Sequence, residues 1–358
     1  METDVRINNV NLYFLPVKTR MPLKFGSETL TEVVCGRARV EVTSKTGKQA
    51  AGWGESPLSV QWVWPSTLPY TLRLERLMEF TRLLAAAWQN LKESGHPMEL
   101  GWKFQEQKLT AQLTRFNRDH SDDGEHLPWL AALVCCSLFD SALHDAFGII
   151  HNIPTYATYN RQFMNRDLSS YLGEDFSGLY PEDFFDAPAS GTALTAWHLV
   201  GGKDPVSKDE RTGNEPDDGY PVLLEEWIRS DDLTCLKVKL TGTDPDWDID
   251  RLRKIERVGE ELGTVWLTAD FNCQVTDPAY VTKILDILRD QDPRLYQKIL
   301  YVEQPFPYDL EEHPIDVHSV SARKPLFLDE SAHDWRMVKR GRKLGWTGVA
   351  LKTCKTQT

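Results

Sequence analysis

Five short clusters of polar residues follow one another in the second half of the sequence, each at the end of a short apolar run. They are Lys237-Val238-Lys239, Asp270-Phe271-Asn272, Glu303-Gln304-Pro305, Asp329-Glu330-Ser331 and Lys352-Thr353-Cys354-Lys355. Carboxylates are ligands of hard divalent cations, and a lysine whose pKa is changed by nearby charge can move protons. The residue types therefore predict a metal site with lysine bases beside it.

The spacing of these clusters predicts the elements that position them. We expect strands at 236–240, 265–269, 299–302, 326–328 and 349–351, and helices between them at 246–262, 278–290 and 333–344. A further strand at 193–200 and a helix at 220–230 precede this series. Such steps suit one strand, one helix and two loops per unit, as in a (β/α) barrel, where the C-terminal strand ends meet at one mouth.

The first 150 residues have a different pattern. Residues 6–15 and 33–43 alternate apolar and polar side chains, and the turn Thr46-Gly47-Lys48 follows, which predicts an antiparallel meander. Apolar residues recur at helical spacing over 72–91, and 128–149 reads as a second, mostly buried helix. We therefore predict an α+β domain over 1–150 and an α/β barrel domain over 151–358.

Composition limits the partners. The chain has 358 residues and a formal charge of −12, which argues against nucleic acid as a partner. Its most apolar stretch, 127–150, is interrupted by Asp140, His144 and Asp145, so we expect no membrane span. The charged N-terminal residues and six cysteines without a CxxC pair predict a cytoplasmic protein with reduced thiols. We also predict a homo-oligomer.

With these motifs the chain resembles the enolase superfamily, and within it the muconate-lactonizing-enzyme subgroup that includes the dipeptide epimerases. The resemblance rests on the five clusters and extends to Gly52-Trp53-Gly54-Glu55 and to residues 138–145. It implies a capping domain followed by a (β/α)7β-type TIM barrel. One departure is that the sequence stops after about the sixth barrel strand, so we expect the C-terminal part of the barrel to be missing.

The three acids Asp270, Glu303 and Asp329 are oxygen ligands at successive strand ends, which suits Mg²⁺, with Mn²⁺ as an alternative. Salt-bridged residues at a barrel mouth are the structural alternative for the same three positions. The family pattern implies that Asp329, rather than its neighbour Glu330, is the third ligand.

Lys237 and Lys239 share a strand face by alternation, and each lowers the proton affinity of the other. The resemblance implies that Lys239 is the base on one face of the substrate and that Lys352 faces the other side. Lys237 then lowers the pKa of Lys239 or contacts the substrate carboxylate. Further substrate contacts are predicted at Asn272, Phe25, Trp53 and Lys355, for which a turn, packing or surface role is the alternative; Phe25 lies in a segment, Met21 to Glu28, that looks like the family's lid loop.

This chemistry is the abstraction of a proton α to a carboxylate, with stabilisation of an enolate. Lysines on both faces favour an isomerase, namely an epimerase or racemase acting on a dipeptide or N-acyl amino acid. The same residues also permit cycloisomerisation or β-elimination, as in muconate lactonizing enzymes and o-succinylbenzoate synthases. An alternative of another class is a non-catalytic, metal-binding relative. In each enzymatic case the partner is a small molecule that bears a carboxylate.

Overall fold

A computed structural model describes residues 1–25, 28–184, 194–264 and 266–358. The chain forms two compact units. Unit 1 comprises Met1–Val17, Glu32–Thr192 and Lys352–Thr358, and unit 2 comprises Lys18–Thr31 and Ala193–Leu351. The domain boundary proposed at residue 150 stays a prediction; in this division the described residues 151–184 group with unit 1.

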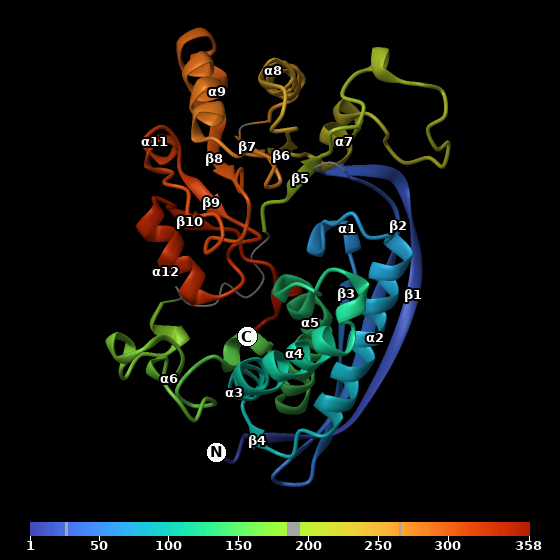
Figure 1. The fold of residues 1–358 in the computed structure, drawn as a ribbon, viewed down its shortest axis with the longest axis vertical. Coiled ribbons are helices and arrows are strands. Elements are labelled where there is room, and N and C mark those ends of the chain that lie inside the picture. Colours follow the sequence, from blue (N-terminus) through green and yellow to red (C-terminus); the bar gives the residue numbers. More distant parts are fainter. Residues whose placement is uncertain (26–27, 185–193, 265) are drawn as a thin grey trace. The chain divides into compact units, whose positions relative to one another are not determined.

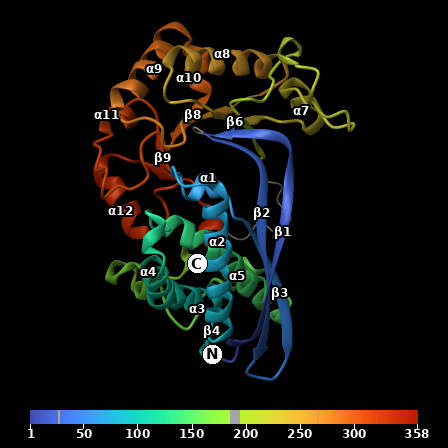
Figure 2. The same ribbon diagram turned by 45° about the vertical axis from the view of Figure 1, so that its right-hand side comes forward.

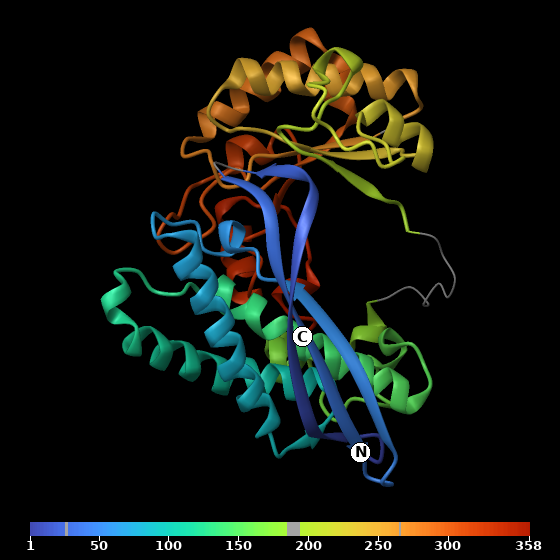
Figure 3. The ribbon, with the colours of Figure 1, turned by 90° about the vertical axis from the view of Figure 1, so that its right-hand side faces the viewer.

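The predicted meander is present as a four-stranded sheet in the order β3-β2-β1-β4. Its strands are β1 (Val5–Phe25), β2 (Glu28–Ser44), β3 (Gln49–Pro57) and β4 (Ser94–Gly95). Strands β2 and β3 pair in antiparallel register from Cys35↔Pro57 to Thr43↔Gln49. Gly47 makes the turn between them with φ of 84°, a conformation that glycine adopts without steric cost. Figure 3 shows β1 and β2 as a long twisted ribbon.

The two long helices of unit 1 lie where the apolar periodicity predicts them, as α2 (Tyr70–Gln89) and α5 (Trp129–His151). The other helices are α1 (Val60–Val63), α3 (Pro97–Lys103), α4 (Thr110–Asp119) and α6 (Ser169–Leu172), with a π-helical turn at Phe104–Leu109. Short 3₁₀ turns occupy Ser121–Asp123, Thr155–Thr158, Glu174–Phe176, Pro181–Asp183 and Thr353–Lys355.

Helix α5 is the centre of the unit 1 core and packs on β3 (Figure 2). The approach is close enough to require the glycines of the Gly-Trp-Gly motif. A Cβ at Gly52 would lie 2.4 Å from the carbonyl oxygen of Ala142, and one at Gly54 would lie 2.1 Å from that of Leu138. These two glycines therefore have a packing role that the sequence motif by itself did not reveal.

Among the described residues, α5 alone is long and apolar enough to cross a membrane by length and composition. Most of its side chains are buried within unit 1, as in the core helix of a globular domain. Its polar residues are also accommodated there: the carboxylate of Asp140 accepts hydrogen bonds from the backbone N–H groups of Gln357 at 2.7 Å and Thr358 at 2.8 Å.

Unit 2 contains a six-stranded parallel sheet in the order β10-β9-β8-β7-β6-β5 (Figure 1). The strands are β5 (Trp197–Val200), β6 (Cys235–Lys239), β7 (Trp266–Asp270), β8 (Ile299–Glu303), β9 (Leu326–Leu328) and β10 (Gly348–Val349). Every strand pairs with the next along the chain, which is the arrangement that the barrel spacing predicts. The α/β class is thus confirmed, and β5 and β10 are the edges of this sheet in the described part of unit 2.

Helices follow the strands as expected. They are α7 (Leu224–Asp231), α8 (Pro245–Glu261), α9 (Pro278–Gln291), α10 (Pro293–Lys298), α11 (His318–Ser321) and α12 (Trp335–Leu344), with a 3₁₀ turn at Lys208–Glu210. Asp244 and Asp277 cap α8 and α9 by accepting hydrogen bonds from backbone N–H groups of the first turn. Helix α7 begins later than predicted, because the carboxylate of Glu226 accepts the N–H groups of Val222 and Leu223 and so fixes its start.

The segment from Met21 to Glu28 differs from the lid loop that the sequence suggested. Met21 to Phe25 continue strand β1, and Glu28 begins β2. The side chain of Phe25 lies outside the described part of the structure, so its predicted substrate contact stays a prediction.

The contact between α5 and β3 generates the first prediction. Gly54→Ala should lower the free energy of unfolding by about 1–3 kcal/mol, since its Cβ meets helix backbone that cannot move aside alone. Gly36→Ala in β2 is the matched control, because its Cβ would meet Leu138 at an ordinary 3.5 Å. Urea unfolding of the two variants checks this, and equal stability of both would contradict it.

Candidate metal and lysine site

Three of the predicted site residues lie in one row across neighbouring strands. In the parallel register Lys239 of β6 pairs with Asp270 of β7, which pairs with Glu303 of β8. Paired residues of parallel strands point to the same face, so these three side chains emerge side by side at the C-terminal strand ends. Lys237 lies two residues earlier on the same face, paired with Thr268.

These four residues, Lys237, Lys239, Asp270 and Glu303, form an ion-pair cluster. Oδ2 of Asp270 lies 2.5 Å from Nζ of Lys239 and 2.9 Å from Nζ of Lys237. Lys237 also donates a hydrogen bond to Oε1 of Glu303 and so bridges the two acids. Both carboxylates are 1% exposed, which means that their charges depend on neighbours within the protein rather than on water.

Charge within the cluster shifts proton affinities in opposite directions. Burial alone would raise the pKa of Asp270, but Lys239 and Lys237 hold it below its ordinary value. Burial and the charge of Asp270 raise the pKa of Glu303 to about 7, against the opposing effect of Lys237. Burial would lower the pKa of Lys237, but Asp270 and Glu303 raise it above its ordinary value.

The pKa of Lys237 corrects one expectation. The sequence suggested that two adjacent ammonium groups would lower each other's proton affinity, but the structure brings two carboxylates into contact with Lys237. With these acids as neighbours Lys237 holds its proton firmly. It is therefore suited to act as a fixed positive charge rather than as a base.

The third predicted ligand, Asp329, follows β9 directly. Glu303 pairs with Phe327, and Asp329 lies two residues beyond Phe327, which places it on the same side by strand alternation. Asp329 is 1% exposed, and its neighbour Glu330 is 4% exposed. Glu330 accepts a hydrogen bond from the Cys273 thiol at 3.6 Å.

Asp270, Glu303 and Asp329 have the oxygen donors that a divalent cation prefers, but their carboxylates are not arranged as a complete set of metal ligands. Within the described ranges, no three His, Cys, Asp or Glu side chains stand close enough together to hold a metal ion. Yet three buried carboxylates lie at the ends of consecutive strands or directly after them, and burial together with the charge of Asp270 raises the pKa of Glu303. Oδ1 of Asn272 is buried without a hydrogen-bond partner among these residues, so an acceptor is also available.

The backbone at this end of the sheet is unusual. Asn272, Cys273 and Gln304 have φ values of 49°, 60° and 31°. Residues other than glycine rarely adopt this left-handed region. The N–H of Asn272 donates to Oδ1 of Asp270 at 2.9 Å, so the turn after β7 itself fixes that carboxylate. Strained residues of this kind persist only where surrounding contacts determine them, and they concentrate at functional sites.

The remaining predicted residues belong to unit 1. Lys352 has its ammonium 4.6 Å from the centroid of the Trp62 ring, and Lys355 is buried. Trp53 lies within strand β3, half exposed, with its ring 6.0 Å from that of Tyr13. Lys352, Lys355 and Trp53 belong to unit 1, whereas the ion-pair cluster belongs to unit 2. The catalytic and substrate-binding roles of these three residues therefore stay predictions.

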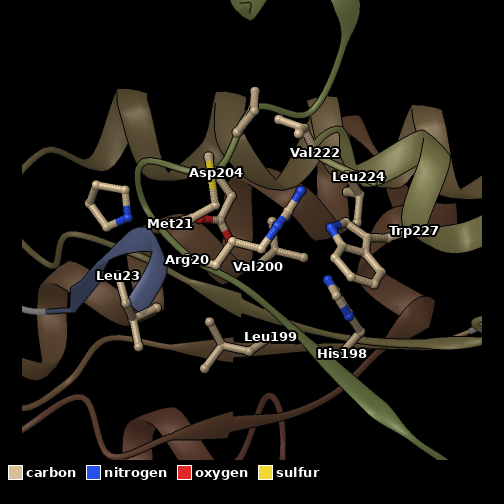
Figure 4. A pocket seen from close by; sticks show the side chains of 12 residues that line it. Arg20, Met21, Leu23, His198, Leu199, Val200, Asp204, Val222, Leu224 and Trp227 are labelled. Carbon is tan, nitrogen blue, oxygen red and sulfur yellow. The ribbon is translucent and has the colours of Figure 1, made fainter. Parts of the chain in front are cut away.

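A cavity of about 250 Å³ in unit 2 is lined by residues other than those of the cluster, and Figure 4 shows the side chains of its lining. His198, which lines it, pairs with Leu236 and therefore faces the opposite side of the sheet from Lys237. Its ring lies 5.6 Å from that of Trp227. Arg20, also in the lining, is already paired with Asp218 at 2.7 Å. The side chains of the predicted site do not line this cavity in the described structure.

Sequence reasoning missed Gln304. It was noticed only as part of a motif, although its side chain is fully buried and makes four hydrogen bonds at the strand ends. The sequence feature that could have indicated this role is the position of Gln304 between Glu303, the last residue of β8, and Pro305.

Comparison with known proteins supports the fold assignment. No protein-family profile and no curated sequence matches the chain. Among solved structures, the L-Ala-D/L-Glu epimerase from Bacillus subtilis matches with a TM-score of 0.58 and 18% identity, over 98% of this chain and 75% of the epimerase. The dipeptide epimerase from Enterococcus faecalis V583, complexed with Mg and the dipeptide L-Leu-L-Tyr, matches with a TM-score of 0.58 and 16% identity, over 98% and 75%.

The N-succinyl Arg/Lys racemase from Bacillus cereus ATCC 14579 matches with a TM-score of 0.57 and 17% identity, over 98% of this chain and 73% of the racemase. These proteins belong to the enolase superfamily. The chain therefore shares its fold with these epimerases and this racemase, and this likeness supports the fold that the sequence resemblance implied.

The ion-pair cluster generates the second prediction. Asp270→Asn should lower the free energy of unfolding by about 3–5 kcal/mol, because it leaves two ammonium groups without the acid they share. Adding Lys237→Met should recover part of this loss, which a double-mutant cycle in urea measures. The control is Asp286→Asn, whose pair with Arg323 is partly exposed and should contribute less than about 1 kcal/mol. Strictly additive effects at Asp270 and Lys237 would contradict the coupling.

Proposed function

We propose that this protein is a Mg²⁺-dependent enzyme that moves a proton α to a carboxylate, acting as an epimerase or racemase on a dipeptide or N-acylated amino acid. The observation that carries the proposal is the row Lys239, Asp270 and Glu303 across three strand ends, with Lys237 beneath it. It combines buried acids with two ammonium groups within contact distance of them.

Asp270, Glu303 and Asp329 would hold the cation, and Asn272 offers a further buried oxygen close to Asp270. A divalent cation bound there supplies positive charge to a substrate carboxylate as negative charge builds on its oxygens during deprotonation. Asp270 is buried and ionised before any cation binds, because its pKa lies below the ordinary value.

The two lysines of β6 have different tasks in this proposal. Lys237 keeps its proton, and in this proposal its fixed charge would bind the substrate carboxylate. Lys239 contacts a single oxygen of the cluster, Oδ2 of Asp270, and is the base for one face of the α-carbon once that contact is exchanged for substrate. Lys352 is proposed as the acid and base for the other face.

The substrate class follows from the same chemistry. A proton α to a carboxylate is removed only where the developing charge is stabilised, so a carboxylate-bearing small molecule is required. Lysines on both faces permit deprotonation on one side and reprotonation on the other, which inverts the α-carbon. The three fold relatives described above are epimerases or racemases of amino acid derivatives, and this favours the same class here.

Proton exchange with solvent tests this function and gives the third prediction. In D₂O with millimolar Mg²⁺, the protein should exchange the α-proton of at least one member of a panel of dipeptides and N-succinyl amino acids. Lys239→Ala and Lys352→Ala should each abolish inversion, while each retains exchange of the stereoisomer whose proton the remaining lysine removes. NMR of each pure stereoisomer measures this directly.

The matched control is Lys298→Ala, which removes a half-buried, ion-paired lysine just before the start of β8, at the opposite end of that strand from Glu303. It should keep both exchanges. Exchange of acid-sugar protons with none on the amino acid panel would overturn the substrate class. Loss of both exchanges in the Lys352 variant, with both retained in the Lys239 variant, would overturn the division between the two faces.

A further inference from the structure

The side chain of Gln304 occupies the space between the ends of β8 and β9. It is fully buried, and both atoms of its amide are saturated with hydrogen bonds. Oε1 accepts the backbone N–H groups of Asp329 at 2.8 Å and Ser331 at 3.2 Å. Nε2 donates to the carbonyl oxygen of Phe306 at 3.0 Å and to Oγ of Ser331 at 2.9 Å.

The backbone of Gln304 makes two more connections. Its N–H donates to the carbonyl oxygen of Phe327 in β9 at 2.9 Å, and its own carbonyl oxygen accepts the N–H of Cys273, after β7, at 2.8 Å. Gln304 directly follows Glu303 and adopts a φ of 31°, which six hydrogen bonds hold in place. One residue thus joins the ends of the three strands that carry Asp270, Glu303 and Asp329.

We infer that Gln304 is a positioning residue that sets the relative placement of the three acids and so determines the cation affinity of the site. This inference rests on the proposed metal site. Gln304 offers no free atom to a ligand, because its amide is used within the protein. Its influence passes through the N–H of Asp329 and the peptide that links it to Glu303.

The substitution Gln304→Met tests this role, because it keeps the length of the side chain but removes all four of its hydrogen bonds. It should weaken Mn²⁺ binding about 10–100-fold, as is usual when the residues that orient metal ligands are lost. Ser331→Ala removes one of those four bonds and should fall between the wild type and Gln304→Met. Titration calorimetry and the EPR signal of free Mn²⁺ measure the affinities without any need for turnover.

The variant Leu288→Ala distinguishes a positioning role of Gln304 from a general loss of stability. Leu288 is fully buried in α9, and its truncation should lower the unfolding midpoint while leaving Mn²⁺ affinity within twofold of the wild type. The inference is overturned if Gln304→Met binds Mn²⁺ within twofold of the wild type, or if Leu288→Ala weakens binding as much as Gln304→Met does. A wild-type protein whose Mn²⁺ binding is absent, or is unchanged by Asp270→Asn, overturns the proposed metal site as well.

Discussion

The site depends on one shared oxygen, Oδ2 of Asp270, which contacts the ammonium groups of both Lys237 and Lys239. A carboxylate buried this deeply remains charged only because those cations lie beside it. The lysines in turn are tolerated within the sheet because their ammonium groups form ion pairs with Asp270 and Glu303. The cluster is therefore a unit in which each charge is the condition for the others, and a change at Asp270 affects all four residues.

The fold serves this cluster by fixing register. Parallel pairing places Lys239, Asp270 and Glu303 at one level, and a slip by one residue would turn any of them to the opposite face. The turns beyond the strands then refine their positions through left-handed backbone at Asn272 and Gln304. In unit 1 close packing has a comparable effect, since Gly52 and Gly54 allow α5 to lie directly on β3.

Much of this arrangement could be predicted from the sequence. The apolar runs and their spacing located strands β5 to β10, and alternation alone placed Lys237 and Lys239 on one face. The hydrogen bonds of Gln304 could not be predicted, because they depend on where the loops after β8 and β9 meet in space. The bridge from Lys237 to Glu303 joins side chains 66 residues apart and likewise requires the folded sheet. In the Gly52-Trp53-Gly54 motif, the sequence suggested a role for the tryptophan. The structure instead explains the two glycines, which allow α5 to pack closely on β3.

The proposed function requires that the acids at the ends of β7, β8 and β9 hold one divalent cation. A crystal structure at saturating Mg²⁺, with Mn²⁺ anomalous scattering to identify the ion, tests it most directly. We expect one ion bound by Asp270, Glu303 and Asp329, with oxygen–metal distances of about 2.0–2.1 Å for Mg²⁺. The Lys237 ammonium should then no longer bridge Asp270 and Glu303. An ion-free site under those conditions, with that bridge intact and Asp329 directed elsewhere, would contradict the proposed metal site.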